Sequence, residues 1–109
     1  MHLSELSQRA CTIRQHYALL EQERYGQAWT CEDIAMGFVG DVGDMMKLVM
    51  AQKGIRAIPD ASARLAHELA DCLWSLLVLA DQYGIDMERA FLQTMDQLEQ
   101  QITQERGQQ

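Results

Sequence analysis

Residues 30–54 read TCEDIAMGFVGDVGDMMKLVMAQKG, a run with helical periodicity that begins on a capping threonine and ends on a glycine. Thr30 suits the start because its hydroxyl can accept a backbone N–H of the first turn, where Glu32 and Asp33 also favour the positive end of the helix dipole. Gly54 is a common residue just past a helix end. The pattern therefore predicts a helix that follows Thr30 and ends near Lys53.

The apolar face of this helix contains two acids. At about 100° per residue, the apolar side chains within roughly 60° of Asp41 are Ile34, Phe38, Met45 and Leu48. Asp44 lies on the flank of the same stripe. The helix thus brings two carboxylates to the side that should face the core.

The next helix repeats this arrangement. It is predicted to start at Asp60 or Ser62, after the only proline, and to reach Tyr83 before Gly84. The apolar side chains in a similar arc around Glu68 are Ala61, Leu65, Cys72 and Leu79, and Asp71 follows three residues later.

Four carboxylates near one another in an apolar setting repel each other and lose hydration, at a cost of several kcal/mol for even one unpaired charge. A hard divalent cation removes that cost, so we expect Asp41, Asp44, Glu68 and Asp71 to bind Mg²⁺, or Mn²⁺ in its place. The alternative is that Asp41 and Asp44 only border the core and form ion pairs with Lys47, Arg56 or Arg64.

Two further helices flank this pair. One is predicted over residues 3–24, and the other follows Asp86, with Ala90, Phe91, Met95, Leu98 and Ile102 facing inward and a polar end at about 104–109 that should fray. We therefore expect an all-α fold, a four-helix bundle completed within the chain or by homo-oligomerisation, with residues 1–109 as one domain.

Charge and composition exclude several classes of function. A net charge of −7 disfavours broad binding to nucleic acid or to an anionic membrane. The three cysteines are far apart and lack CxxC spacing, and no apolar run approaches the ~20 residues of a membrane span. We expect a soluble protein of the cytoplasm with reduced thiols.

Glycines and aromatic residues near the acids have more than one interpretation. Gly37, Gly40 and Gly43 recur every third residue, which indicates close packing of a neighbouring helix or subunit more than ligand contact. Trp29 is a candidate for stacking on a base, whereas Trp74 is about 120° from Glu68 and fits packing on the first helix or an interface better.

Residues 38–45, FVGDVGDM, and 67–74, HELADCLW, resemble the MazG-like nucleotide pyrophosphohydrolases. That family has an EExxE motif followed by ExxD, and its dCTP-pyrophosphatase-like branch has a VGEVGEL run that this chain matches with aspartate for each glutamate. The similarity covers approximately residues 29–98.

The resemblance implies an all-α homodimer or homotetramer that binds magnesium and cleaves nucleoside triphosphates to a monophosphate and pyrophosphate. Asp41, Asp44, Glu68 and Asp71 match the metal ligands of the family. Metal-bound phosphates and an activated water, with a carboxylate as general base, fit these residues without a covalent nucleophile.

The chain departs from the family pattern at three places. Gly40 stands where many members have the first glutamate of EExxE, although the dCTP-pyrophosphatase-like branch also has glycine there. Asp41 and Asp44 are each one methylene shorter than glutamate, and residues 91–98, FLQTMDQL, lack the lysine that many relatives use to bind phosphate. The candidates for phosphate binding, from the same or another subunit, are then Lys47, Lys53, Arg56 or Arg64, with Trp29 for the base. The alternative for each of these cations is that it only solvates the helix surface.

We therefore expect a Mg²⁺-dependent enzyme that removes unwanted nucleoside triphosphates. A noncatalytic helical scaffold or binding protein is the alternative, favoured by the missing lysine. Hydrolysis of another phosphorylated metabolite by the same metal chemistry is a third interpretation.

Overall fold

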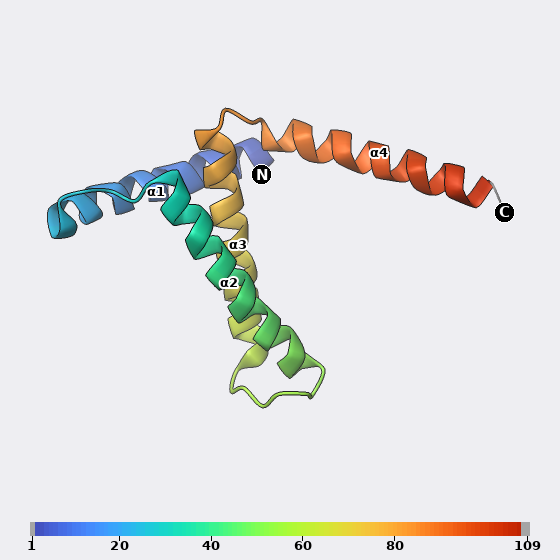
Figure 1. The fold of residues 1–109 in the computed structure, drawn as a ribbon, viewed down its shortest axis with the longest axis horizontal. Helices are drawn as coiled ribbons and strands as arrows, with labels where there is room; N and C mark the ends of the chain where they lie inside the picture. Colours follow the sequence, from blue (N-terminus) through green and yellow to red (C-terminus); the bar gives the residue numbers. More distant parts are fainter. Residues whose placement is uncertain (1, 108–109) are drawn as a thin grey trace.

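The computed structural model describes residues 2–107, and within them it contains α-helices and no strand (Figure 1). The helices are α1 (Leu3–Tyr25), α2 (Cys31–Gln52), α3 (Ala61–Gln82) and α4 (Met87–Gly107). The all-α prediction is confirmed. The last helix continues to Gly107, so the fraying expected from about residue 104 is not seen there, and residues 108–109 lie outside the described range.

Capping explains where α2 and α4 begin. The Thr30 hydroxyl accepts the N–H of Asp33 at 3.2 Å, and the Asp33 carboxylate accepts the N–H of Thr30 at 2.9 Å, which is a reciprocal capping box. Asp86 accepts the N–H of Arg89 in the same way. Asp60 differs from the prediction, because it precedes α3 with a left-handed backbone and its side chain makes no capping bond.

The helices α2 and α3 run antiparallel and pack along their length as a hairpin (Figure 1). α1 lies across the open end of this hairpin and packs on α3. The residues buried where these helices meet are Ala10, Ile34, Leu77 and Val78. This core fixes α1 at the open end of the hairpin, beside the start of α2 and the last turns of α3.

The fourth helix projects away from the hairpin and contacts α1 and α3 at its start (Figure 1). The side chains of Phe91, Met95, Leu98 and Ile102 are exposed, and none of the α4 residues is buried. The prediction that these side chains face inward is wrong for the single chain, because none of the other helices that the structure describes lies along α4. The bundle is therefore not closed within one copy.

Within residues 2–107, no helix combines the length and apolarity needed to cross a bilayer.

Candidate metal centre

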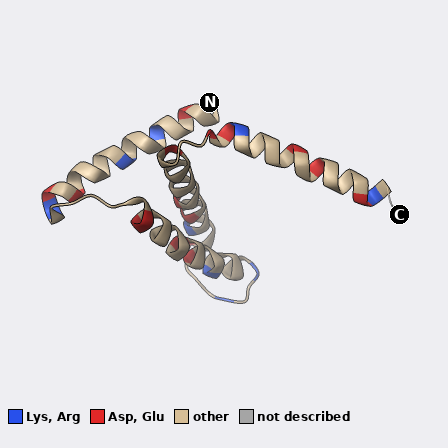
Figure 2. Cartoon of the chain, turned by 45° about the horizontal axis from the view of Figure 1, so that its top comes forward, with Lys and Arg blue, Asp and Glu red and all other residues tan. Residues whose placement is uncertain are grey.

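Three of the four predicted carboxylates converge between α2 and α3. Asp41, Asp44 and Glu68 each place one carboxylate oxygen within 4.8 Å of the other two. The acidic positions of the two helices lie side by side along the hairpin (Figure 2). Antiparallel packing produces this arrangement, since it sets the middle of α2 against the middle of α3.

The cluster is electrostatically unfavourable as it stands. Burial raises the pKa of Asp41, and the charges of Asp71 and Asp44 raise it further. Burial likewise raises the pKa of Glu68, followed by the charges of Asp41, Asp71 and Asp44. In the described part of the chain, Glu68 Oε2 is buried and has no hydrogen-bond partner. A buried polar atom without a partner requires an explanation, and a bound cation is one.

The geometry of the three acids fits a divalent cation. Oxygens on opposite sides of one Mg²⁺ are about 4.2 Å apart, and those around Ca²⁺ are about 4.8 Å apart. The three side chains therefore need at most a small rotamer change to share one ion. Asp44 is exposed, which leaves room on its side for water or substrate oxygens.

Asp71 lies next to this group without joining it. Its carboxylate oxygen is 3.2 Å from Nε2 of His67, one turn earlier on α3, although its charge acts on both Asp41 and Glu68. Asp71 as a metal ligand therefore stays a prediction. His67 is exposed and contacts an acid at the edge of the centre.

A cleft of about 650 Å³ adjoins the centre, within the size range of small-molecule sites. Its lining includes Trp29, Asp41, Asp71 and Trp74, and it lies where α1 meets the hairpin. Trp74 donates Nε1–H to the carbonyl of Ala10 at 3.1 Å and meets Tyr17 edge-to-face, with ring centroids 6.2 Å apart. Trp74 thus packs on α1, which is one of the two environments that its helical phase predicts.

The candidate phosphate-binding cations lie at different distances from the centre. Lys47 is 3.8 Å from the Asp44 carboxylate, and both side chains are exposed. Lys53 follows Asp41 by twelve residues, about 18 Å along the axis of α2, and Arg56 lies beyond it in the connection to α3. In the described part of the chain, Lys47 is the candidate cation for which an ion pair with these acids is observed.

The sequence matches the MazG nucleotide pyrophosphohydrolase domain over residues 40–103, which is more than half of the chain. The chain belongs to the MazG family. No curated protein and no solved structure matches it. The matched range contains Asp41, Asp44, Glu68 and Asp71, and it begins after Trp29. Membership in this family indicates nucleotide pyrophosphohydrolase activity and dependence on a divalent metal.

The glycines of α2 do not share one role in this MazG chain. A Cβ at Gly37 would lie 3.3 Å from Cζ3 of Trp29, so the missing side chain lets the indole approach the helix. A Cβ at Gly40 or Gly43 would meet nothing within 4 Å in the described chain. The close approach expected from the glycine spacing is therefore seen at Gly37, and it involves a tryptophan rather than a helix.

Two residues at the cleft were missed by the sequence analysis. Arg14 is buried on α1 and forms an ion pair with Glu21 at 2.8 Å, and both side chains line the cleft. The sequence gives one indication that Arg14 is buried, which is its position next to the apolar stripe of Ile13 and Tyr17. An arginine is seldom buried unless it is paired, but the sequence does not show where its partner would lie.

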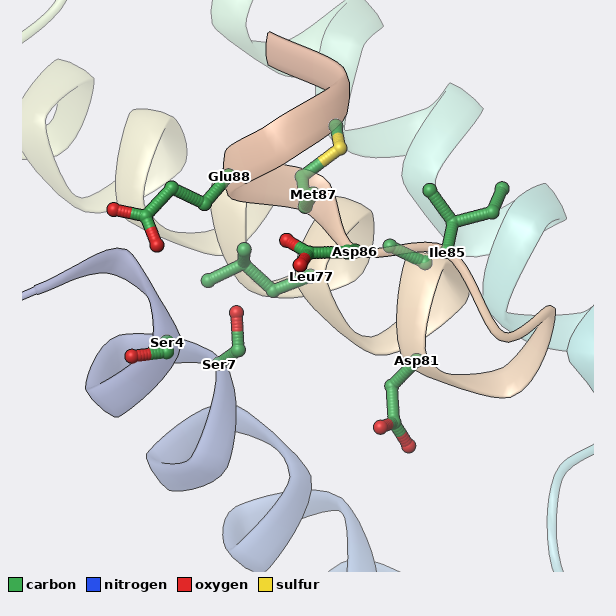
Figure 3. A pocket seen from close by; sticks show the side chains of 9 residues that line it. Ser4, Ser7, Leu77, Asp81, Ile85, Asp86, Met87 and Glu88 are labelled. Carbon is green, nitrogen blue, oxygen red and sulfur yellow. The ribbon is translucent and has the colours of Figure 1, made fainter. Parts of the chain in front are cut away.

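A second cavity of about 190 Å³ lies between the start of α1, the end of α3 and the start of α4 (Figure 3). Its lining contains Asp81, Asp86 and Glu88, and the carboxylates of Asp81 and Glu88 point in different directions. Asp86 caps α4, so its carboxylate already has a structural role. Among the described residues, the group of acids close enough to share one cation is therefore the one between α2 and α3.

Proposed function

We propose that this chain is a Mg²⁺-dependent nucleoside triphosphate pyrophosphohydrolase that releases a nucleoside monophosphate and pyrophosphate. Mn²⁺ would serve in place of Mg²⁺. The observation on which the proposal depends most is the convergence of Asp41, Asp44 and Glu68, with an unpartnered buried oxygen on Glu68, beside a cleft large enough for a nucleotide.

In this mechanism Asp41, Asp44 and Glu68 would hold the cation. When bound, a divalent cation neutralises phosphate oxygens and lowers the pKa of an attacking water. Asp71 lies outside this group of three oxygens. We propose that it either accepts the proton of the attacking water as a general base or binds the cation as a fourth ligand. A bond forms between the water oxygen and phosphorus, the bridging α–β P–O bond breaks, and pyrophosphate leaves.

We propose that the nucleobase binds in the cleft and stacks on Trp29. Its indole is half exposed and lines the cleft together with Asp41 and Asp71. Aromatic faces stack on nucleobases with about 1–3 kcal/mol per base and little preference for sequence. This placement allows the phosphates of a bound nucleotide to extend from Trp29 toward the carboxylates.

We propose that a second copy of the chain completes the fold and supplies phosphate-binding cations. The apolar side chains exposed along α4 support pairing, and a homodimer or homotetramer would cover them. Lys47 would bind phosphate from the same copy as the acids. Lys53 and Arg56 would reach the acids only from another copy, given their distance along α2.

Purified protein incubated with each of the common ribo- and deoxyribonucleoside triphosphates and Mg²⁺ tests this function. We expect pyrophosphate and a monophosphate as products, and no inorganic phosphate. Chelation of the metal should stop the reaction. Release of phosphate alone, or turnover that survives chelation, would reject the proposal.

A noncatalytic MazG-like binding protein is the second candidate, because residues 91–98 contain no cation and Lys47 is already next to Asp44. Such a protein would bind Mg²⁺ and nucleotides without releasing pyrophosphate. The same panel, combined with calorimetric binding of Mg²⁺, separates the two functions. In either case we place the protein in the cytoplasm, where its thiols stay reduced and nucleotides are abundant.

A further inference from the structure

The backbone of Trp29 is fastened to α1 by an ion pair. Arg14 directs Nη1 and Nη2 at the two carboxylate oxygens of Glu21, at 2.9 and 2.8 Å. Nη2 also donates to the carbonyl of Trp29 at 3.2 Å, and the N–H of Trp29 donates to Glu21 Oε1 at 2.7 Å. Both polar groups of the Trp29 backbone are therefore held by one pair of side chains.

The indole of Trp29 is confined from the opposite direction by α2. Gly37 leaves the space that the ring occupies, and a Cβ there would come within 3.3 Å of it. Residue 29 belongs to the connection between α1 and α2, which has no helical hydrogen bonds of its own. The ion pair and the glycine thus fix a loop residue that would otherwise have many conformations.

Direct binding of phosphate by Arg14 is the competing interpretation, and its hydrogen bonds argue against it. Both Nη atoms already donate to Glu21 or Trp29, and its positive charge is matched by the Glu21 carboxylate. The bond from Arg14 lowers the pKa of Glu21, so this carboxylate stays ionised. A pair whose charges balance, and whose guanidinium already makes three hydrogen bonds, has less to offer an anion than a free arginine.

Packing alone does not explain the pair either. Arg14 is 8% exposed, and taking two charges out of water costs more than burying apolar side chains of similar size. Leucine or methionine at these positions would fill the same space. Apolar side chains, however, would provide neither the donor that Arg14 offers to the Trp29 carbonyl nor the acceptor that Glu21 offers to the Trp29 N–H.

We propose that Arg14 and Glu21 are positioning residues that hold Trp29 as a preformed stacking wall for the nucleobase. This inference rests on the proposed function and deepens it. A fixed wall lowers the entropy lost on binding, so its removal weakens nucleotide affinity. Because the base is remote from the bond that breaks, the loss falls on KM and leaves kcat nearly unchanged.

The test is a double-mutant cycle on Glu21→Ala and Trp29→Ala, with calorimetric Kd values for dAMP, dCMP, dGMP and dTMP in Mg²⁺. Each single variant should weaken the best-bound monophosphate at least about 5-fold, the low end of one base–aromatic stack. If Glu21 acts through Trp29, the double variant should bind no more weakly than Trp29→Ala alone. Glu23→Ala, an exposed acid on the same helix, should bind as the unmodified protein does.

A conservative variant guards against loss of folding. Glu21→Gln keeps an acceptor oxygen for the Trp29 N–H and loses the ion pair, so we expect a smaller loss in the same direction. Circular dichroism establishes which variants fold, and Glu21→Gln replaces Glu21→Ala in the cycle if the alanine variant does not. A merely structural role for Glu21 would instead lower the melting temperature with unchanged Kd.

The outcomes separate this inference from the proposed function. Nucleotide binding that depends on Trp29 and Glu21, without pyrophosphate release, would reject the function and support the wall. Pyrophosphate release with unchanged Kd and KM in Glu21→Ala would overturn the wall and support the function. The wall would also be overturned if the loss of affinity in the double variant equalled the product of the losses in the two single variants. It would likewise be overturned if the unmodified protein bound none of the monophosphates.

Discussion

Glu68 has the least favourable surroundings of the four predicted acids. Its Oε2 is buried without a partner, and its pKa is raised by burial and by three neighbouring carboxylates. Neighbouring Cys72 is also affected, since burial, followed by the charges of Asp41, Glu68 and Asp71, raises the pKa of its thiol. Such surroundings disfavour a further negative charge, and a cation would relieve the repulsion.

Replacing Glu68 by glutamine should separate stability from function. Glu68→Gln removes a buried charge at similar size, so without metal it should unfold at a melting temperature a few degrees higher, from a gain of roughly 1 kcal/mol. Pyrophosphate release should fall about 100-fold or more, because a metal ligand is lost. Thermal melts in chelator and product assays in Mg²⁺ measure the two effects.

Glu32→Gln is the matched control, since it makes the same change at an exposed acid of α2. It should leave turnover as it is. Equal turnover in Glu68→Gln and Glu32→Gln would contradict the role given to Glu68.

Gly37 should respond to alanine differently from Gly40. Alanine favours a helix by up to about 1 kcal/mol over glycine, and Gly40→Ala should gain this because its Cβ meets open space. Gly37→Ala should gain less and shift the tryptophan emission, since its Cβ must displace Trp29. Identical stability and spectra for the two variants would show that the indole does not lie on Gly37.

At the residue level, the sequence was informative wherever a helix fixes the direction of a side chain. Helical phase predicted that Asp41 and Asp44 would lie on the core side of one helix and Glu68 on the core side of the next, and the structure brings their oxygens together. Phase did not predict the contact between Asp71 and His67, which depends on rotamers. The bonds from Arg14 and Glu21 to Trp29 depend on how the loop folds back on α1, which no local pattern encodes.

Among the elements, the helices and their ends were predictable because caps are local. The Thr30 box and the glycines after α1, α2 and α3 mark boundaries that the structure has. The start of α3 was less predictable, since Asp60 adopts a left-handed backbone and its side chain makes no cap. The connection before it, rather than the capping preference of aspartate, sets its conformation.

The fourth helix shows where periodicity stops being sufficient. Its pattern correctly identifies an apolar face, but it does not say whether that face meets the same chain or another one. In the structure Met95 and Leu98 remain exposed.

A charge on this face should therefore change assembly. We expect Leu98→Glu to dissociate the oligomer, seen as a smaller species in sedimentation velocity, because the new carboxylate would be buried between copies. Gln100→Glu adds the same charge on another side of α4 and should sediment as the unmodified protein. Unchanged assembly in Leu98→Glu would remove α4 from the proposed interface.

The whole molecule exposes more surface than a closed monomer of its mass. Its accessible area is 8444 Å², against about 6,100 Å² expected for a compact protein of 12.4 kDa. Its radius of gyration is 17.7 Å, against about 13 Å for a compact domain of this length. The excess area is comparable to an obligate dimer interface. We propose that residues 1–109 form one domain that is completed by a second copy.

Metal and pH should act together on stability. In the unfolded chain Asp41 and Glu68 have their ordinary pKa values of 3.8 and 4.5. Because both pKa values are raised in the folded protein, the folded protein binds these protons more tightly than the unfolded chain does. Without metal, their contribution to the free energy of unfolding therefore falls as pH rises from these values through the raised ones. Mg²⁺ requires the ionised carboxylates, so its stabilisation should appear as pH rises through the same window.

Melting temperatures across pH, with chelator and with Mg²⁺, measure this effect. Glu21 has a lowered pKa and changes stability with pH in the opposite direction. The difference in melting temperature between the unmodified protein and Glu68→Gln therefore isolates the pH effect of Glu68 from that of Glu21. A Mg²⁺-induced increase in melting temperature that is as large in acid as at neutral pH would contradict the expected linkage.

A crystal structure with Mn²⁺, analysed by anomalous scattering, tests the metal centre most directly. We predict an anomalous peak within coordination distance of Asp41, Asp44 and Glu68, with Glu68 Oε2 among the ligands. No peak between α2 and α3, or a Glu68 carboxylate paired with a lysine or arginine of a second copy, would contradict it.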